Sequence, residues 1–207
     1  MTLRAQLSKL ALLVLCSLLG LCSSLAPGLA QTPPQEPAPS VAPAAPTRQK
    51  LFDDLFAQLK QAPDAAAAAQ VRAMIESVWT HSGSATADLL MARAEAALQH
   101  GDGALAQQLL DHVVILYPDW PEGWRRRAQA ALALGDAEGA MVDLNHALTV
   151  EPRDYLALDA LAALMRDSGK NKQALELMRR SLAIDPQDAP LRDATEKLAP
   201  EVEGREI

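Results

Sequence analysis

Aromatic side chains are scarce in this chain, whose 207 residues include three tryptophans, two tyrosines and two phenylalanines. Sandwiches and barrels of β-strands depend on aromatic and β-branched residues for much of their packing, so this composition disfavours them. Hydrophobic residues nonetheless make up 49% of the chain, and most of them are Ala and Leu. Such residues favour closely packed helices.

Cysteine is almost absent. Cys16 and Cys22 are the two cysteines, and both lie in the N-terminal segment. Residues 23–207 therefore offer no disulfide, thiolate metal site or cysteine nucleophile.

Positive charge is also in short supply, with 19 Lys and Arg against 26 Asp and Glu. The longest basic run is residues 125–127. A nucleic-acid surface must neutralise many phosphates, so no nucleic-acid partner is expected. P-loop, GxGxxG and HExxH motifs are absent as well, and no cofactor or metal is expected.

Two histidine patterns are weak candidates for chemistry. His112 and His146 lie one repeat apart and are interpreted as solvated, because neighbouring repeats are too far apart for both to bind one ion. His81 and Ser84 resemble a base and a nucleophile, but no strand–turn–helix context surrounds them, and a turn is the better interpretation. We therefore expect a protein that is not an enzyme. An envelope hydrolase is the less favoured alternative.

The first 30 residues have the layout of a secretory signal peptide. Arg4 and Lys9 precede an apolar stretch over residues 10–21, and Gly28 and Ala30 are small residues at the two positions that a signal peptidase inspects. Cleavage after Ala30 predicts an exported protein that is free of the membrane. Its compartment is the periplasm if the host is a Gram-negative bacterium. The alternative is an uncleaved anchor that holds an assembly module at the inner membrane.

Residues 31–49 are interpreted as a disordered linker, because residues 31–47 contain six prolines among Ala, Gln and Ser. The pattern changes to helix at Lys50. Apolar residues at helical spacing predict a pair of helices over residues 50–86, with Asp64 able to cap the second.

Self-similarity at an interval of 34 residues is the strongest feature of the sequence. Such a period is typical of a helical solenoid. Glycine belongs in the turn within each unit, alanine where its helices cross, and proline where its second helix ends. Larger apolar columns face the neighbouring unit. The six columns are Ala94, Ala128 and Ala162; Gly101, Gly135 and Gly169; Ala106, Ala140 and Ala174; Leu110, Leu144 and Met178; Val114, Leu148 and Leu182; and Pro118, Pro152 and Pro186.

These columns resemble the tetratricopeptide repeat (TPR) family, with Trp124 meeting one of its aromatic preferences. The resemblance implies an all-α, right-handed solenoid with units at 87–120, 121–154 and 155–188. Residues 50–86 then form a degenerate N-terminal pair and residues 189–199 a capping helix, while residues 200–207 are expected to be a flexible tail. Departures from the family pattern include Arg93 and Arg127, which replace a leucine; we expect their guanidinium groups to be paired or in water.

The resemblance also implies a function, which is non-catalytic binding of an extended peptide or a helix of another protein in the concave groove. We expect a monomer or a weak homo-oligomer. Arg125 could clamp a carboxylate through two N–H groups, or it could simply be a solvated cation. Met91 and Glu95 differ from the Lys, Asn and Arg set with which some relatives hold a chaperone's C-terminal carboxylate, so that activity is not expected. The residues placed along the groove are Met91, Glu95, Leu98, Arg125, Gln129, Leu132, Asp159, Ala163 and Arg166.

Overall fold

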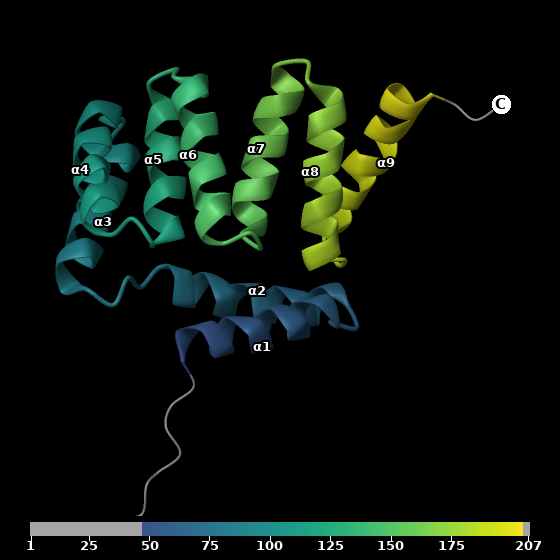
Figure 1. The fold of residues 1–207 in the computed structure, drawn as a ribbon, viewed down its shortest axis with the longest axis horizontal. Coiled ribbons are helices and arrows are strands. Elements are labelled where there is room, and N and C mark those ends of the chain that lie inside the picture. The colour runs from purple at the N-terminus through teal and green to yellow at the C-terminus, as the bar shows by residue number, and fades with distance from the viewer. Residues whose placement is uncertain (1–46, 205–207) are drawn as a thin grey trace, which may run out of the picture. The chain divides into compact units, whose positions relative to one another are not determined.

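The computed structural model describes residues 47–204. The predicted signal peptide, the predicted linker up to residue 46 and residues 205–207 lie outside the described residues. The described part forms α-helices joined by short turns and contains no β-strand, which confirms the predicted all-α class. In chain order the helices are α1 (Arg48–Lys60), α2 (Ala65–Trp79), α3 (Ala85–Gln99), α4 (Gly103–Leu116), α5 (Pro121–Ala133), α6 (Ala137–Val150), α7 (Tyr155–Asp167), α8 (Asn171–Ile184) and α9 (Ala189–Glu203) (Figure 1).

Three helical hairpins, α3–α4, α5–α6 and α7–α8, stand side by side in a stack (Figure 1). A glycine of the recurring column lies in the turn of each hairpin. Gly101, Gly135 and Gly169 have φ angles of 77°, 81° and 72°, in the left-handed region that costs glycine little. The predicted equivalence of these turns is confirmed, so the three units share one register.

Alanine occupies the crossing of the two helices in each hairpin. With only a methyl group at these positions, the two backbones approach closely, and larger apolar residues then fill the space between units. The alanines of both columns are buried, as are Leu110, Leu144 and Met178 of the larger column.

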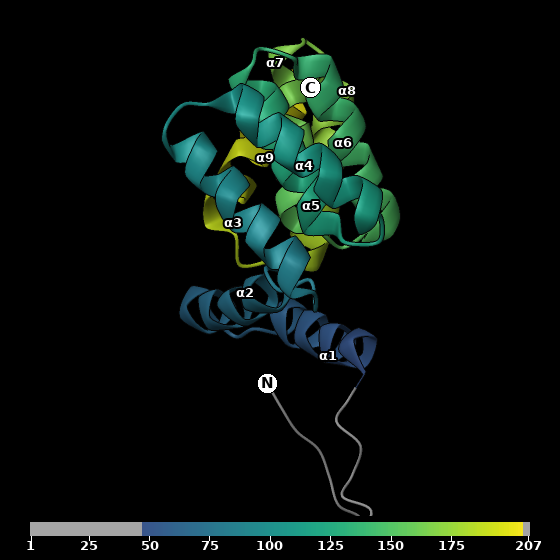
Figure 2. The ribbon, with the colours of Figure 1, turned by 90° about the vertical axis from the view of Figure 1, so that its left-hand side faces the viewer.

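Helices α1 and α2 form a hairpin that does not continue the stack. They pack on each other through Phe52, Phe56 and Trp79, and they run across one end of the other helices (Figures 1 and 2). The sequence predicts a degenerate N-terminal unit here, and the structure does have a helical pair. It lacks the glycine and alanine columns of the three units, and it lies out of line with them.

The α1–α2 hairpin contacts the turn that follows each of the three units, two of which lead to the next unit and the third to α9. In the first turn Trp120 Nε1 donates a hydrogen bond to the Trp79 carbonyl oxygen at 2.7 Å. In the second, Arg153 Nη1 donates to Asp53 Oδ1 at 2.7 Å. In the third, Gln187 Nε2 donates at 3.0 Å to a carbonyl oxygen at the bend between α1 and α2. These contacts fix α2 beneath the stack.

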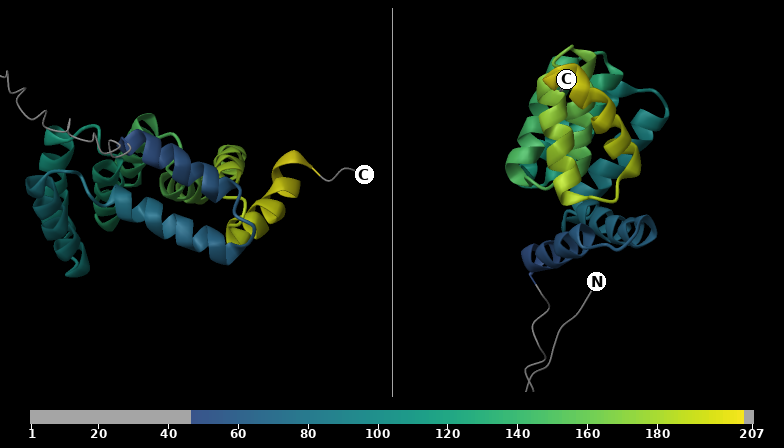
Figure 3. Two further views of the ribbon diagram at one scale, coloured as in Figure 1. Left: turned by 90° about the horizontal axis from the view of Figure 1, so that it is seen from below. Right: turned by 90° about the vertical axis from the view of Figure 1, so that its right-hand side faces the viewer.

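Helix α9 covers the last unit, as predicted for a capping helix (Figure 3). Leu198 is buried in the core cluster that includes residues of α7 and α8, and Leu191 packs against the same cluster. The helix extends to Glu203, however, so the predicted flexible tail is wrong for residues 200–203. Pro200 lies inside the helix, and an ion pair between Arg179 and Glu203, 2.6 Å long, holds the last turn on α8. None of the described helices is long and apolar enough to cross a membrane.

Candidate functional site

The first helices of the three units, α3, α5 and α7, share one face of the stack with α9, and we call this the inner face. Figure 2 shows α3 and α9 on one side of the stack and α4, α6 and α8 on the other. All of the residues predicted to bind a peptide belong to α3, α5 and α7. The structure divides them between two clefts, the core and the open surface.

The first cleft lies between α3 and α5 and has a volume of about 400 Å³. Three predicted residues, Glu95, Leu98 and Gln129, line it together with Arg126. Arg126 is 3.2 Å from Glu95 Oε1 and donates to Gln129 Oε1 at 3.3 Å. This cleft is therefore mainly polar, and its charges are already matched.

The second cleft lies between α7 and α9 and has a volume of about 280 Å³. Three predicted residues, Asp159, Ala163 and Arg166, line it. Apart from Asp188 and Pro190 at the start of α9, small and apolar side chains form the rest of its wall. These side chains are Ala162, Met178, Leu191 and Ala194.

A third cleft, of about 420 Å³, lies where α2 passes beneath the first turns of α7 and α9. Arg72 and Glu76 of α2 line it opposite Tyr155. Asp159 and Asp188 line both this cleft and the one between α7 and α9. The two clefts adjoin, and we call them together the α7–α9 groove.

Met91 and Arg125 are not open to a ligand. Met91 is 5% exposed and packs in the core of the first unit. The Arg125 side chain is 16% exposed and forms ion pairs with Glu122 and, at 3.2 Å, with Asp154. Its guanidinium carbon lies 5.5 Å from the ring centre of Trp79. The α1–α2 hairpin therefore covers the residue that the sequence offered as a carboxylate clamp, whereas Leu132 is exposed on the surface.

The electrostatic environment explains why the Arg125 side chain stays paired with Asp154. Burial lowers the pKa of the Arg125 guanidinium and raises the pKa of the Asp154 carboxyl, and the attraction between the two groups opposes both shifts. Removing Arg125 would leave the Asp154 carboxylate buried without a cation, whereas Arg125 keeps Glu122 as a partner if Asp154 is removed. These residues are consequently part of the framework of the protein.

Asp159 has an uncompensated environment within the groove. Burial raises the pKa of its carboxyl to about 6; the Ser181 hydroxyl opposes this shift, and the nearby carboxylates of Asp188, Asp185 and Asp154 add to it. Oδ1 of Asp159 is buried and has no hydrogen-bond partner among the described residues. A group in this state favours a cationic neighbour.

Sequence analysis missed the residues that α2 and α9 contribute to the groove. Arg72 and Glu76 are four residues apart on α2, a spacing that reads as an ordinary solvent-facing pair. Asp188 is the N-cap of α9, where its carboxylate accepts a hydrogen bond from the backbone N–H of Leu191 at 2.9 Å. Arg72 and Glu76 reach α7 only because α2 runs across the end of the stack, and the sequence contains no signal for that position of α2.

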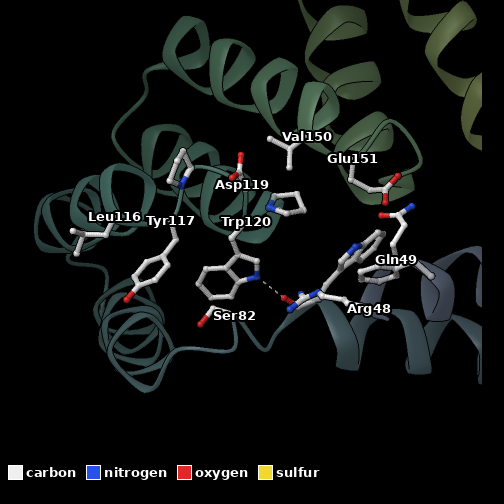
Figure 4. A pocket seen from close by; sticks show the side chains of 13 residues that line it. Arg48, Gln49, Ser82, Leu116, Tyr117, Asp119, Trp120, Val150 and Glu151 are labelled. Atoms are coloured by element: carbon white, nitrogen blue, oxygen red, sulfur yellow. Dashed lines mark hydrogen bonds between the residues drawn. The ribbon is translucent and has the colours of Figure 1, made fainter. Parts of the chain in front are cut away.

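Another cleft, of about 440 Å³, lies between the start of α1 and two of the connecting turns (Figure 4). Two polar side chains in its wall, those of Arg48 and Tyr117, already contact other groups of the protein. Arg48 donates to the carbonyl oxygens of Val78 and His81 at the end of α2, and the hydroxyls of Tyr117 and Ser84 are 2.7 Å apart. This cleft is part of the contact between the α1–α2 hairpin and the stack.

The histidines do not form a catalytic or metal site with their predicted partners. Ser84 is bonded to Tyr117, and His81 Nδ1 lies 2.9 Å from the Ser77 carbonyl oxygen. His112 and His146 are exposed, as expected. Over residues 47–204, no group of three or more His, Cys, Asp or Glu is arranged to hold a metal ion.

Stacked helical hairpins with an open inner face define a helical-repeat protein of the kind that serves as an interaction scaffold. A TPR repeat-containing protein of Rhizobium etli is 36% identical over 157 residues, which span 76% of each chain. The chain belongs to the TPR family. No family model matches it.

Solved structures agree on the fold. The Sgt2 TPR domain of Aspergillus fumigatus is 22% identical with a TM-score of 0.52, and the match covers 58% of this chain and 81% of that one. The first TPR domain of Spaghetti (RPAP3), solved with a bound HSP90 peptide, is 19% identical with a TM-score of 0.53 over 57% of this chain and 94% of that one. These likenesses establish the helical solenoid.

Proposed function

We propose that this protein is a non-catalytic scaffold that binds a segment of a partner protein along its inner face. The observation that carries the proposal is the α7–α9 groove, whose two adjoining clefts are left open by the chain's own side chains. It contains Asp159, Ala163 and Arg166, three residues that the repeat register placed on the binding face. The peptide-bound Spaghetti domain supports this use of the fold.

Size favours a single segment as the ligand. Clefts of about 280 and 420 Å³ suit a few side chains each, and they lie end to end along α7. A segment can extend from them towards the polar cleft between α3 and α5, where Glu95 and Arg126 offer hydrogen-bonding groups. Because the α1–α2 hairpin covers Arg125 at the start of α5, the ligand approaches from the open side of α7 and α9.

The proposed location is outside the cytoplasm, and it is supported by the charged start and apolar stretch of residues 1–30. If the host is a Gram-negative bacterium, the compartment is the periplasm. Mass spectrometry of the protein purified from its host tests this point. A mature chain that begins at Gln31 is expected, whereas retention of residues 1–30 would support the membrane-anchored alternative.

Selection from a displayed library of random peptides tests binding at the inner face. We expect enriched peptides to bind the parent protein and to lose at least tenfold in affinity for Ala163→Trp, because an indole at this exposed position fills the groove. The matched control is Ala183→Trp, at an exposed alanine on α8. Equal binding by the two variants, or no enrichment at all, would contradict the proposal.

A further inference from the structure

We propose that the α7–α9 groove recognises a partner segment with an apolar side chain next to a lysine or arginine. The apolar side chain lies between α7 and α9, and the cationic side chain enters the adjoining cleft above α2. This inference rests on the proposed function and specifies the chemistry of its ligand.

The apolar part of the site is the cleft between α7 and α9. Ala162, Ala163 and Ala194 leave a hollow there, and Met178 and Leu191 form apolar wall beside it. Burying a ligand methylene on such a surface contributes about 0.8 kcal/mol. This part of the groove provides affinity for an aliphatic side chain with little selectivity.

The charged part of the site is the cleft above α2, and the balance of its charges is negative. Arg72 lines the cleft, but its guanidinium is paired with Asp185. Three further carboxylates line the same cleft, those of Glu76, Asp159 and Asp188. Arg72 attracts Asp188 and Arg125 attracts Glu76, whereas no cation is among the main influences on the pKa of Asp159.

Hydrogen bonds within the protein satisfy these carboxylates only in part. The Tyr155 hydroxyl donates to Glu76 Oε1 at 3.0 Å, and Asp188 Oδ1 accepts the α9 cap bond. Asp159 Oδ1 is buried and has no hydrogen-bond partner among the described residues, and burial raises the pKa of this carboxyl. An incoming ammonium or guanidinium group supplies the missing positive charge and also donates hydrogen bonds.

The occupant is a side chain of a partner rather than a metal ion, because the carboxylates of the described residues do not converge on a common point. A basic segment also complements the protein as a whole, whose net charge is −7. An acidic segment, by contrast, would place its carboxylates against Glu76, Asp159 and Asp188.

The test uses the peptides enriched by the parent protein, with titration calorimetry as the readout. We expect enriched peptides to share a Lys or Arg next to an aliphatic residue. Replacing that residue by norleucine or citrulline should weaken binding by about tenfold or more. Asp159→Asn should weaken binding of the basic peptide to the same degree but leave the neutral peptide unchanged. The matched control, Asp167→Asn, changes an exposed carboxylate at the end of α7 and should have no effect.

Two contrary results would be distinguishable. If Ala163→Trp blocks binding while Asp159→Asn and the neutral peptide both match the parent, the inner face is the site and the cationic specificity is wrong. Enrichment of acidic peptides would also overturn the specificity. If Ala163→Trp has no effect on binding, the proposed function fails and the specificity fails with it.

Discussion

Replacing Asp159 by asparagine should stabilise the protein near neutral pH and have little effect in acid. The two side chains have nearly the same shape, so the substitution removes the charge and preserves the packing. In the folded protein, burial raises the pKa of this carboxyl to about 6, whereas in the unfolded chain it titrates near its ordinary value of about 3.9. The folded state therefore binds the proton more tightly.

The sign of the effect follows from this difference. Between about pH 4 and pH 6 the folded protein carries more bound protons than the unfolded chain, so Asp159 lowers the free energy of unfolding as the pH rises. One pKa unit corresponds to 1.36 kcal/mol, which sets an upper limit of about 3 kcal/mol. Because Asp159 is only partly buried, we expect Asp159→Asn to gain about 1–2 kcal/mol at pH 7.5.

Urea unfolding of the parent and of Asp159→Asn at several pH values between 4 and 7.5 measures this gain. The difference between the two proteins isolates Asp159, because other carboxyl groups titrate in both. It should be near zero at pH 4 and reach its full value above pH 7. A difference that does not change with pH would refute the assignment of an uncompensated carboxylate at this position.

Three further substitutions test the packing. Ala128→Leu should overfill the helix crossing of the second unit and cost about 1–3 kcal/mol in urea unfolding; a parent-like midpoint would show that the register is wrong. Gly135→Ala should lower the free energy of unfolding by about 1–2 kcal/mol. The loss comes from the positive φ alone, since nothing lies within 4 Å of the added methyl. An unchanged stability would mean that residue 135 adopts a different turn. Arg72→Met should cost about 1–3 kcal/mol because it leaves Asp185 buried and unpaired, and adding Asp185→Asn should recover part of that loss; no recovery would contradict the pairing.

The stack of helical hairpins could be predicted from the sequence because the residues that produce it recur at a fixed interval. A glycine with positive φ lies in the turn within each hairpin of the stack, where Gly101, Gly135 and Gly169 supply it. A side chain larger than methyl does not fit at the helix crossings, so alanine returns at the same interval. Arg127 also behaves as predicted: its Nε donates to Asp143 Oδ2 at 2.9 Å, and its guanidinium is paired.

The position of α2 could not be predicted, because it depends on contacts that occur once each. Trp79 accepts from Trp120 through its backbone carbonyl, which any residue could provide. Arg72 donates a hydrogen bond to Asp185, which lies 113 residues further along the chain. Neither contact has a period or a motif, and the burial of Arg125 follows from the same packing.

The end of α9 escaped prediction for a different reason. Proline usually ends a helix, so Pro200 suggested a loose tail. The structure continues the helix because Val202 packs against the last unit and Glu203 pairs with Arg179. Tertiary contacts here outweigh a local preference.

A crystal structure of the protein with one enriched peptide tests the central claim most directly. The account predicts peptide density between α7 and α9, with an aliphatic side chain beside Ala163 and a cationic nitrogen within hydrogen-bonding distance of Asp159. A peptide seated on α4, α6 and α8, or in the cleft at the start of α1, would contradict it.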